Sequence, residues 1–202
     1  MLQTQTVAPE LVEFLKFVMK SDVFSDFLLV GGTALALQIG HRNSVDLDFF
    51  GNSEIDADLF RREISEYGES RVLKQSKNIL ILEVNGLKVD FVNYKYPVIA
   101  KPSVIDNIRL ASKQDIAAMK LNAISGRGSK KDFVDLYFLL KEFTLPEIIE
   151  FYLQKYKDGS KFLVVKSLSY FEDADEFDNP KMFKEFSWDN CKKIILEEVK
   201  RL

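Results

Sequence analysis

The sequence predicts an α+β protein, with a small mixed β-sheet and flanking helices followed by a helical C-terminal part. Residues 71–94 hold two β-rich runs around an Asn-Gly pair at 85–86, which is typical of a two-residue hairpin turn. After Pro102 the apolar residues recur at helical spacing almost throughout. We therefore expect a sheet-containing domain over residues 1–100 and a helical domain over residues 101–202.

Each helix and strand is predicted from a local signal in the sequence. Pro9 opens an amphipathic helix, an apolar run stopped by two glycines predicts a buried strand, and an Asp cap with a Gly stop marks an exposed helix. In the first domain we expect helices over 9–20, 33–41 and 56–68 and strands over 27–30, 45–50, 79–84 and 87–94. In the second we expect helices over 113–125, 130–143, 145–157, 160–171 and 187–201, with the acidic stretch 172–180 as a loop.

The composition excludes several classes of function. The net charge is −3, so a nucleic-acid partner would have to use a local basic patch. The single cysteine, Cys191, permits no internal disulfide and, with one histidine, makes a zinc site implausible. No apolar run reaches membrane-spanning length, and the N-terminus lacks the pattern of a signal peptide. We expect a cytoplasmic protein with no membrane partner.

Two carboxylates alternate on the strand expected at 45–50. Side chains two residues apart on a strand share a face, so Asp46 and Asp48 are expected on one face. The other face, toward the core, would hold Val45, Leu47 and Phe49. By itself such a pair is more often a solvated strand face than a functional site.

Two neighbouring features favour a functional site. Asp90 interrupts an apolar alternation, and if its strand lies beside the first, three carboxylates converge. Oxygen ligands of this kind suit Mg²⁺, which also binds substrate phosphates. Gly31, Gly32 and Thr33 stand at a strand-to-helix junction, where backbone amides favour phosphate.

The order of these motifs resembles a known family. The segment 31-GGTALALQIGHRNSVDLDFF-50 and the later segment 120-KLNAISGRGSKKDFVDL-136 are similar to motifs of the AbiEii/AbiGii toxins. These are nucleotidyltransferase toxins of type IV toxin–antitoxin systems, with a polymerase-β-like palm. The resemblance spans roughly residues 28–140. It departs from the family in length, because this chain is short and its C-terminal helical part is reduced.

The resemblance implies a role for each carboxylate and for the glycine turn. Asp46 and Asp48 would hold a Mg²⁺ on the triphosphate and share a second ion with Asp90, so that two ions are expected. Asp90 would also accept the proton of the acceptor. Gly31, Gly32 and Thr33 would contact the phosphates of the NTP.

Further residues are implied by the second motif, with a plainer reading beside each. Lys120 would reach a phosphate, or else snorkel at a helix edge. Arg127 and, more weakly, Lys131 would contact phosphate or an RNA backbone, or else be solvated. Asp132 is expected to orient Lys120, or else to favour its helix dipole. Asp135 lies deeper and is expected to pair with Lys120 or Arg127, and the helical domain would complete the nucleotide site.

Two further residues lie within the first motif, between the glycine turn and the aspartates. Arg42 is expected to bind the nucleotide as a fixed cation near the aspartates. His41, the only histidine, fits a core-edge position better than a catalytic one.

The leading hypothesis is a Mg²⁺-dependent nucleotidyltransferase that moves an NMP from an NTP to RNA, most simply a tRNA 3′ end. A toxin of this kind would have a cognate antitoxin. Two alternatives stay open: transfer to a small-molecule or protein hydroxyl, and a non-catalytic interaction module that retains the fold.

Overall fold

A computed structural model describes all residues 1–202, and the chain divides into two compact units. Unit 1 holds Met1–Lys95 and Pro102–Ala111, and unit 2 holds Tyr96–Lys101 and Ser112–Leu202. The division differs from the boundary predicted at residue 100, because ten residues beyond it return to unit 1. No helix is both long and apolar enough to span a membrane.

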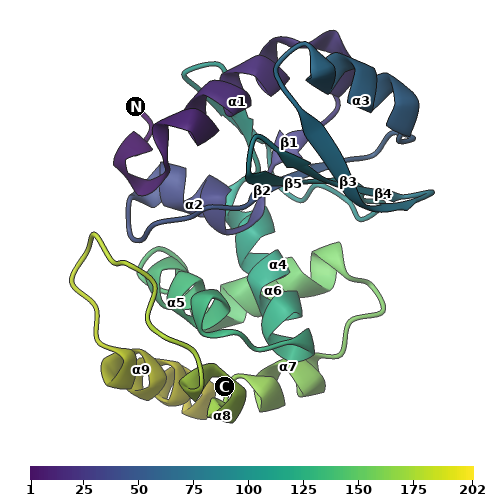
Figure 1. The fold of residues 1–202 in the computed structure, drawn as a ribbon. Coiled ribbons are helices and arrows are strands. Elements are labelled where there is room, and N and C mark those ends of the chain that lie inside the picture. Colours follow the sequence, from purple (N-terminus) through teal and green to yellow (C-terminus); the bar gives the residue numbers. More distant parts are fainter. The chain divides into compact units, whose positions relative to one another are not determined.

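Unit 1 is a mixed sheet with helices (Figure 1). Its helices are η1 (Thr4–Thr6), α1 (Pro9–Lys20), η2 (Asp22–Phe24), α2 (Gly31–Ile39) and α3 (Ala57–Ser65). Its strands are β1 (Leu28–Leu29), β2 (Leu47–Gly51), β3 (Ser70–Ser76), β4 (Ile79–Val84), β5 (Leu87–Asn93), β6 (Ser103–Ile105) and β7 (Ile108–Leu110). They form one seven-stranded sheet in the order β3-β4-β5-β2-β1-β7-β6, in which β2–β5 and β1–β7 are the parallel pairs.

The predicted hairpin of β4 and β5 is confirmed, and the backbone angles of its turn explain why these strands pair. Asn85 and Gly86 both have positive φ, 48° and 82°, which is the requirement of a tight primed turn between antiparallel strands. Val84 and Leu87 are register partners on either side, so β4 and β5 pair along their whole length.

A second hairpin, formed by β6 and β7, was not predicted from the sequence. β6 and β7 are joined by Asp106 and Asn107, whose φ values of 51° and 63° give the same kind of turn. Each strand has only three residues, too few to show an alternation. β7 pairs with β1 through Leu29 and Leu110, which is why this segment belongs to unit 1.

Phenylalanines fill the core of unit 1 on one face of the sheet. Phe49 of β2 stacks on Phe91 of β5 with ring centroids 5.1 Å apart. Phe60 of α3 meets Phe91 edge-on at 5.2 Å, and Phe24 and Phe27 complete the cluster. All five are buried. Burial of one sheet face leaves the opposite face of β2 and β5 for polar side chains.

Unit 2 is helical, as predicted. It holds α4 (Lys113–Gly126), α5 (Lys130–Leu139), α6 (Leu145–Lys155), α7 (Lys161–Ser167), α8 (Glu172–Asp175) and α9 (Trp188–Lys200). The acidic stretch predicted as a loop contains the short helix α8, and α5 ends four residues before the predicted position 143. α6 begins at the predicted place because Thr144 and Glu147 form a capping box.

A buried ion pair ties the connecting segment 96–101 to unit 2. Lys155 of α6 donates to Asp115 of α4 at 2.7 Å and to the carbonyl of Pro97 at 2.8 Å. Asp115 also accepts from the backbone amides of Ile99 and Ala100, at 3.1 and 3.2 Å. Both charged side chains are 4% exposed, so each depends on the other for its charge.

Candidate active site

Asp48 of β2 and Asp90 of β5 are register partners on adjacent parallel strands. The neighbouring pairs Leu47–Val89 and Phe49–Phe91 point into the core, and all four of these side chains are fully buried. The two carboxylates therefore share the opposite face of the sheet. The predicted convergence of the two aspartate-bearing strands is confirmed.

The first carboxylate is placed differently from the prediction. β2 begins at Leu47, so Asp46 lies just before the strand and its direction does not follow from strand alternation. Val45, predicted to point into the core, is 54% exposed. The prediction was wrong here because the alternation 45-VDLDFF-50 continues in sequence beyond the point where pairing with β5 starts.

Gly31 stands against the Asp48 carboxylate. It opens α2 with φ of 68°, and a Cβ atom built on it would lie 2.8 Å from Oδ2 of Asp48. Only glycine combines this backbone angle with so close an approach. Gly32 follows in the first turn of α2, which places the free amides of a helix N-terminus beside Asp48.

Thr33 is turned inward. Its hydroxyl lies within hydrogen-bonding distance of the Asp46 carbonyl and, at 2.8 Å, of the Ser44 hydroxyl, and the residue is 1% exposed. This geometry fixes the chain leading into Asp46 and gives the Thr33 hydroxyl a positioning role, and the contact of Thr33 with phosphate stays a prediction for its backbone amide.

A lysine that sequence analysis did not single out binds the third carboxylate. Lys88 Nζ lies 2.8 and 2.9 Å from the two carboxylate oxygens of Asp90. Burial alone would lower the pKa of Lys88, but the hydrogen bond and charge of Asp90, with the charges of Asp46 and Asp48, outweigh it and raise the pKa. The only signal in the sequence was the two-residue spacing that puts Lys88 and Asp90 on one strand face.

These residues fit a divalent cation by their chemistry. Asp48 and Asp90 are hard oxygen donors side by side, and the three carboxylates together already act on one ammonium. No group of three or more His, Cys, Asp or Glu side chains lies at metal-binding spacing in the chain. Two carboxylates are sufficient for Mg²⁺, which keeps several waters and takes its other ligands from substrate phosphates.

A second cluster of predicted residues lies in unit 2. Lys120 of α4 reaches two carboxylates of α5, Asp132 at 2.9 Å and Asp135 at 2.6 Å. The Lys120 side chain is 7% exposed and both carboxylates are fully buried. The expected pairings are confirmed. The geometry also shows Lys120 as the ion that neutralises two buried carboxylates, so its ammonium is not presented to solvent.

Arg127 belongs to the same cluster but, unlike Lys120, is exposed. Its guanidinium donates to both oxygens of Asp132, at 2.9 and 3.2 Å, while its side chain is 70% exposed. Ser129 donates to Asp132 at 2.7 Å. Burial alone would raise the pKa of Asp132, but the charge of Lys120 and the bonds from Arg127 and Ser129 lower it to about 2. Asp132 therefore holds an exposed guanidinium in a fixed place.

Three further residues were considered from the sequence. Lys131 is exposed at the start of α5. Arg42 is 2% exposed and donates to the backbone carbonyl of Asn43 at 2.8 Å. His41 is fully buried, as its core-edge interpretation required.

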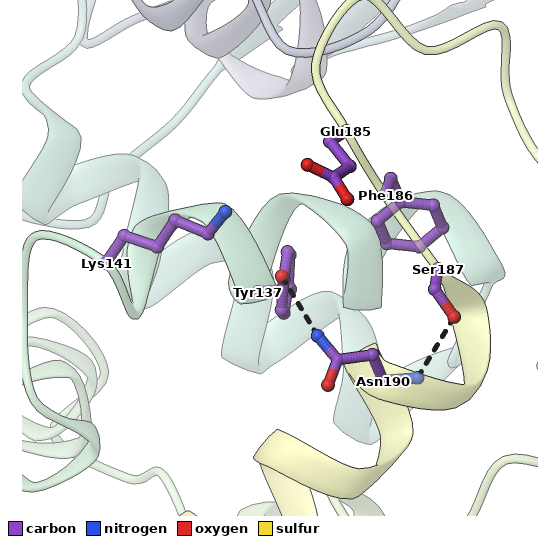
Figure 2. Close-up of a pocket in the computed structure, with 6 residues that line it drawn as sticks. All are labelled: Tyr137, Lys141, Glu185, Phe186, Ser187 and Asn190. Carbon is purple, nitrogen blue, oxygen red and sulfur yellow. Dashed lines mark hydrogen bonds between the residues drawn. The ribbon is translucent and has the colours of Figure 1, made fainter.

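Unit 2 also has a pocket that contains no predicted site residue (Figure 2). It has a volume of about 430 Å³ and is lined by Tyr137, Lys141, Glu185, Phe186, Ser187 and Asn190. Asn190 donates to the Tyr137 hydroxyl at 3.3 Å, and the Lys141 ammonium lies 4.6 Å from the Tyr137 ring centre. Its polar groups thus bind one another, which does not mark it as a catalytic site.

The fold has counterparts among solved structures. MenT4, a nucleotidyltransferase toxin from Mycobacterium tuberculosis H37Rv, aligns with a TM-score of 0.63 and 14% identity over 95% of this chain and 84% of its own. A proposed nucleotidyltransferase from H. pylori aligns with a TM-score of 0.59 and 19% identity over 98% and 94%. Identities this low show a shared fold alone.

The sequence itself gives the family. The model of the nucleotidyl transferase AbiEii toxin family, type IV TA system, matches residues 14–198. The chain therefore belongs to the AbiEii nucleotidyltransferase toxin family. A relative in Aquifex aeolicus (strain VF5), the uncharacterized protein aq_aa25, is 42% identical over 170 residues, which cover 81% of this chain and 82% of the relative.

Proposed function

We propose that this protein is a Mg²⁺-dependent nucleotidyltransferase toxin that transfers an NMP from an NTP to RNA, with a tRNA 3′ end as its acceptor and a cognate antitoxin as its partner. The observation that carries the proposal is the pairing of Asp48 with Asp90 on β2 and β5, beside the N-terminus of α2. Family membership supports the reaction class and the toxin–antitoxin context.

The chain's own residues perform three tasks in this reaction. Asp48 and Asp90, with Asp46 beside them, would hold Mg²⁺, which supplies charge neutralisation for the triphosphate. The amides at the start of α2 bind and orient phosphate oxygens. Asp90 accepts the proton of the acceptor hydroxyl as that oxygen attacks the α-phosphorus and pyrophosphate leaves.

The acceptor side of the proposal depends on local cations, because the net charge of the chain is −3. Arg127 is an exposed guanidinium fixed by Asp132, and such a fork matches a phosphate group. Lys131 adds an exposed charge four residues further on. These two residues are the ones we propose for phosphate contact in unit 2.

A transfer assay tests the proposal. Purified protein is incubated with Mg²⁺, each α-labelled NTP in turn and total tRNA. Label should enter RNA with one or more nucleotides, and Asp48→Asn or Asp90→Asn should reduce transfer by at least about 100-fold, because each removes a charge from the reacting centre. Asp58→Asn in α3 is the matched control, since this carboxylate is 89% exposed, and it should leave transfer unchanged.

The assay also separates the other functions. Label that enters a protein or a small-molecule hydroxyl in place of RNA would establish the alternative acceptors. No transfer to any acceptor, together with no Mg²⁺-dependent NTP binding, would leave an interaction module that retains the fold.

A further inference from the structure

Lys88 forms an ion pair with a carboxylate of the candidate active site. Its ammonium contacts both oxygens of Asp90, at 2.8 and 2.9 Å, from two residues earlier on β5. The Lys88 side chain is 47% exposed and that of Asp90 is 17% exposed. The ammonium therefore covers Asp90 from the solvent side and can leave it at modest cost.

The neighbouring charges favour this choice of partner. Glu83 on β4 lies directly opposite Lys88, but its carboxylate is bound to Arg71 of β3 at 3.1 Å. Asp46 and Asp48 act on the same ammonium through their charges. Lys88 is thus drawn away from its cross-strand neighbour and toward the three aspartates.

We propose that Lys88 is a displaceable counter-ion, which neutralises Asp90 in the resting protein and competes with the divalent cation for that carboxylate. The inference rests on the proposed function, because it takes Asp48 and Asp90 as cation ligands. The ammonium donates a hydrogen bond to Oδ2 of Asp90 at 2.9 Å and lies 2.8 Å from Oδ1, which has no hydrogen-bond partner of its own. It therefore takes the place in which a metal ion would bind that side of the carboxylate.

Displacement is energetically feasible. The ion pair of a half-exposed lysine is a weak interaction, while a divalent ion carries twice the charge of an ammonium and would be held by Asp48 as well as Asp90. Lys88 would then lower the affinity of the site for the cation without abolishing it. In the resting protein Lys88 offsets the charge of Asp90, which lessens the repulsion between the two neighbouring carboxylates.

The test is direct measurement of Mn²⁺ binding, without nucleotide, by titration calorimetry. Lys88→Met should bind Mn²⁺ more tightly than the wild type, by about threefold or more, because the competitor is gone. Lys88→Arg, which keeps a cation on Asp90, should retain the wild-type affinity. Lys74→Met on β3 is the control for the general loss of one positive charge, since Lys74 is exposed on the same sheet.

A double-mutant cycle shows whether the effect passes through Asp90. In an Asp90→Asn background, Lys88→Met should no longer change Mn²⁺ affinity, because the contested carboxylate is absent. The proposal is overturned if Lys88→Met binds Mn²⁺ as the wild type does, more weakly, or no more tightly than Lys74→Met. It is equally overturned if its effect persists beside Asp90→Asn.

These outcomes are distinct from failure of the proposed function. Mn²⁺ binding that is lost in Asp48→Asn but indifferent to Lys88 keeps the metal site and removes only the competition. Absence of Mn²⁺ binding from every variant, with transfer activity also absent, would remove both.

Discussion

A Cβ atom at Gly31 would lie 2.8 Å from the carboxylate oxygen Oδ2 of Asp48. The first residue of α2 and the second residue of β2 therefore lie so close that no side chain fits between them. This contact places the helix N-terminus next to the carboxylate, and it makes Gly31 a residue whose replacement tests the site.

Gly31→Ala should lower nucleotidyl transfer sharply, because the methyl group must push Asp48 out of place. It should also destabilise the protein by about 1–3 kcal/mol through the positive φ. Gly86→Ala separates the two effects, since Gly86 has φ of 82° with no atom within 4 Å of the added Cβ. Comparable loss of stability with full activity in Gly86→Ala is expected, and equal loss of activity in both variants would contradict the role given to Gly31.

Lys120→Met should destabilise the protein by about 3–5 kcal/mol, because it leaves Asp132 and Asp135 buried without their shared cation. Arg127→Met, at an exposed side chain, should cost less than about 1 kcal/mol but should weaken RNA or nucleotide binding. Urea unfolding and a binding titration of both variants check this. A stable Lys120→Met protein would mean that Lys120 is not the structural ion described here.

Asp132 should make stability depend on acid pH. Its pKa in the folded protein is about 2, below the ordinary 3.8, so its contribution is present above pH 3.8 and is lost as the pH falls through 2. The full contribution is about 2 kcal/mol. The difference in unfolding free energy between wild type and Asp132→Asn should be constant near neutral pH and should shrink on acidification. A difference that does not vary with pH would contradict the low pKa.

Lys155→Met should destabilise unit 2 by about 3–5 kcal/mol, because Asp115 would remain buried without its cation. Lys113→Met, in the same helix α4 as Asp115, is the matched control. The ion pair between Lys113 and Glu142 is about one-third exposed, so its loss should cost less than about 1 kcal/mol. Thermal unfolding distinguishes the two variants, and similar melting temperatures would argue against a stabilising role for the buried Asp115–Lys155 ion pair.

The sequence was sufficient for those features that depend on local pattern. The Asn85-Gly86 pair predicted the turn of the β4–β5 hairpin. The alternation of apolar and polar residues along β5 predicted that Asp90 lies on the polar face of the sheet. The pairing of Asp48 with Asp90 could be expected, because two short strands each carried an aspartate among apolar residues.

The features that could not be predicted depend on where pairing starts or on which of several partners a charge selects. The pattern around Val45 continues beyond β2, so sequence alone put its side chain in the core. Lys88 had both Glu83 and Asp90 within reach, and the choice follows from the position of Arg71 on a third strand. The Asp106-Asn107 turn was a signal that could have revealed β6 and β7.

The buried ion pair between Asp115 and Lys155 binds the segment 96–101, and this segment determines how the protein can be divided. Because segment 96–101 belongs to unit 2 and segment 102–111 to unit 1, the chain passes between the units at 95/96, 101/102 and 111/112. No single cut can release either unit whole. A break after 111 leaves the sheet intact but strips unit 2 of the segment that caps its buried carboxylate. Neither unit is therefore a single continuous segment of the chain that could be produced whole without part of the other.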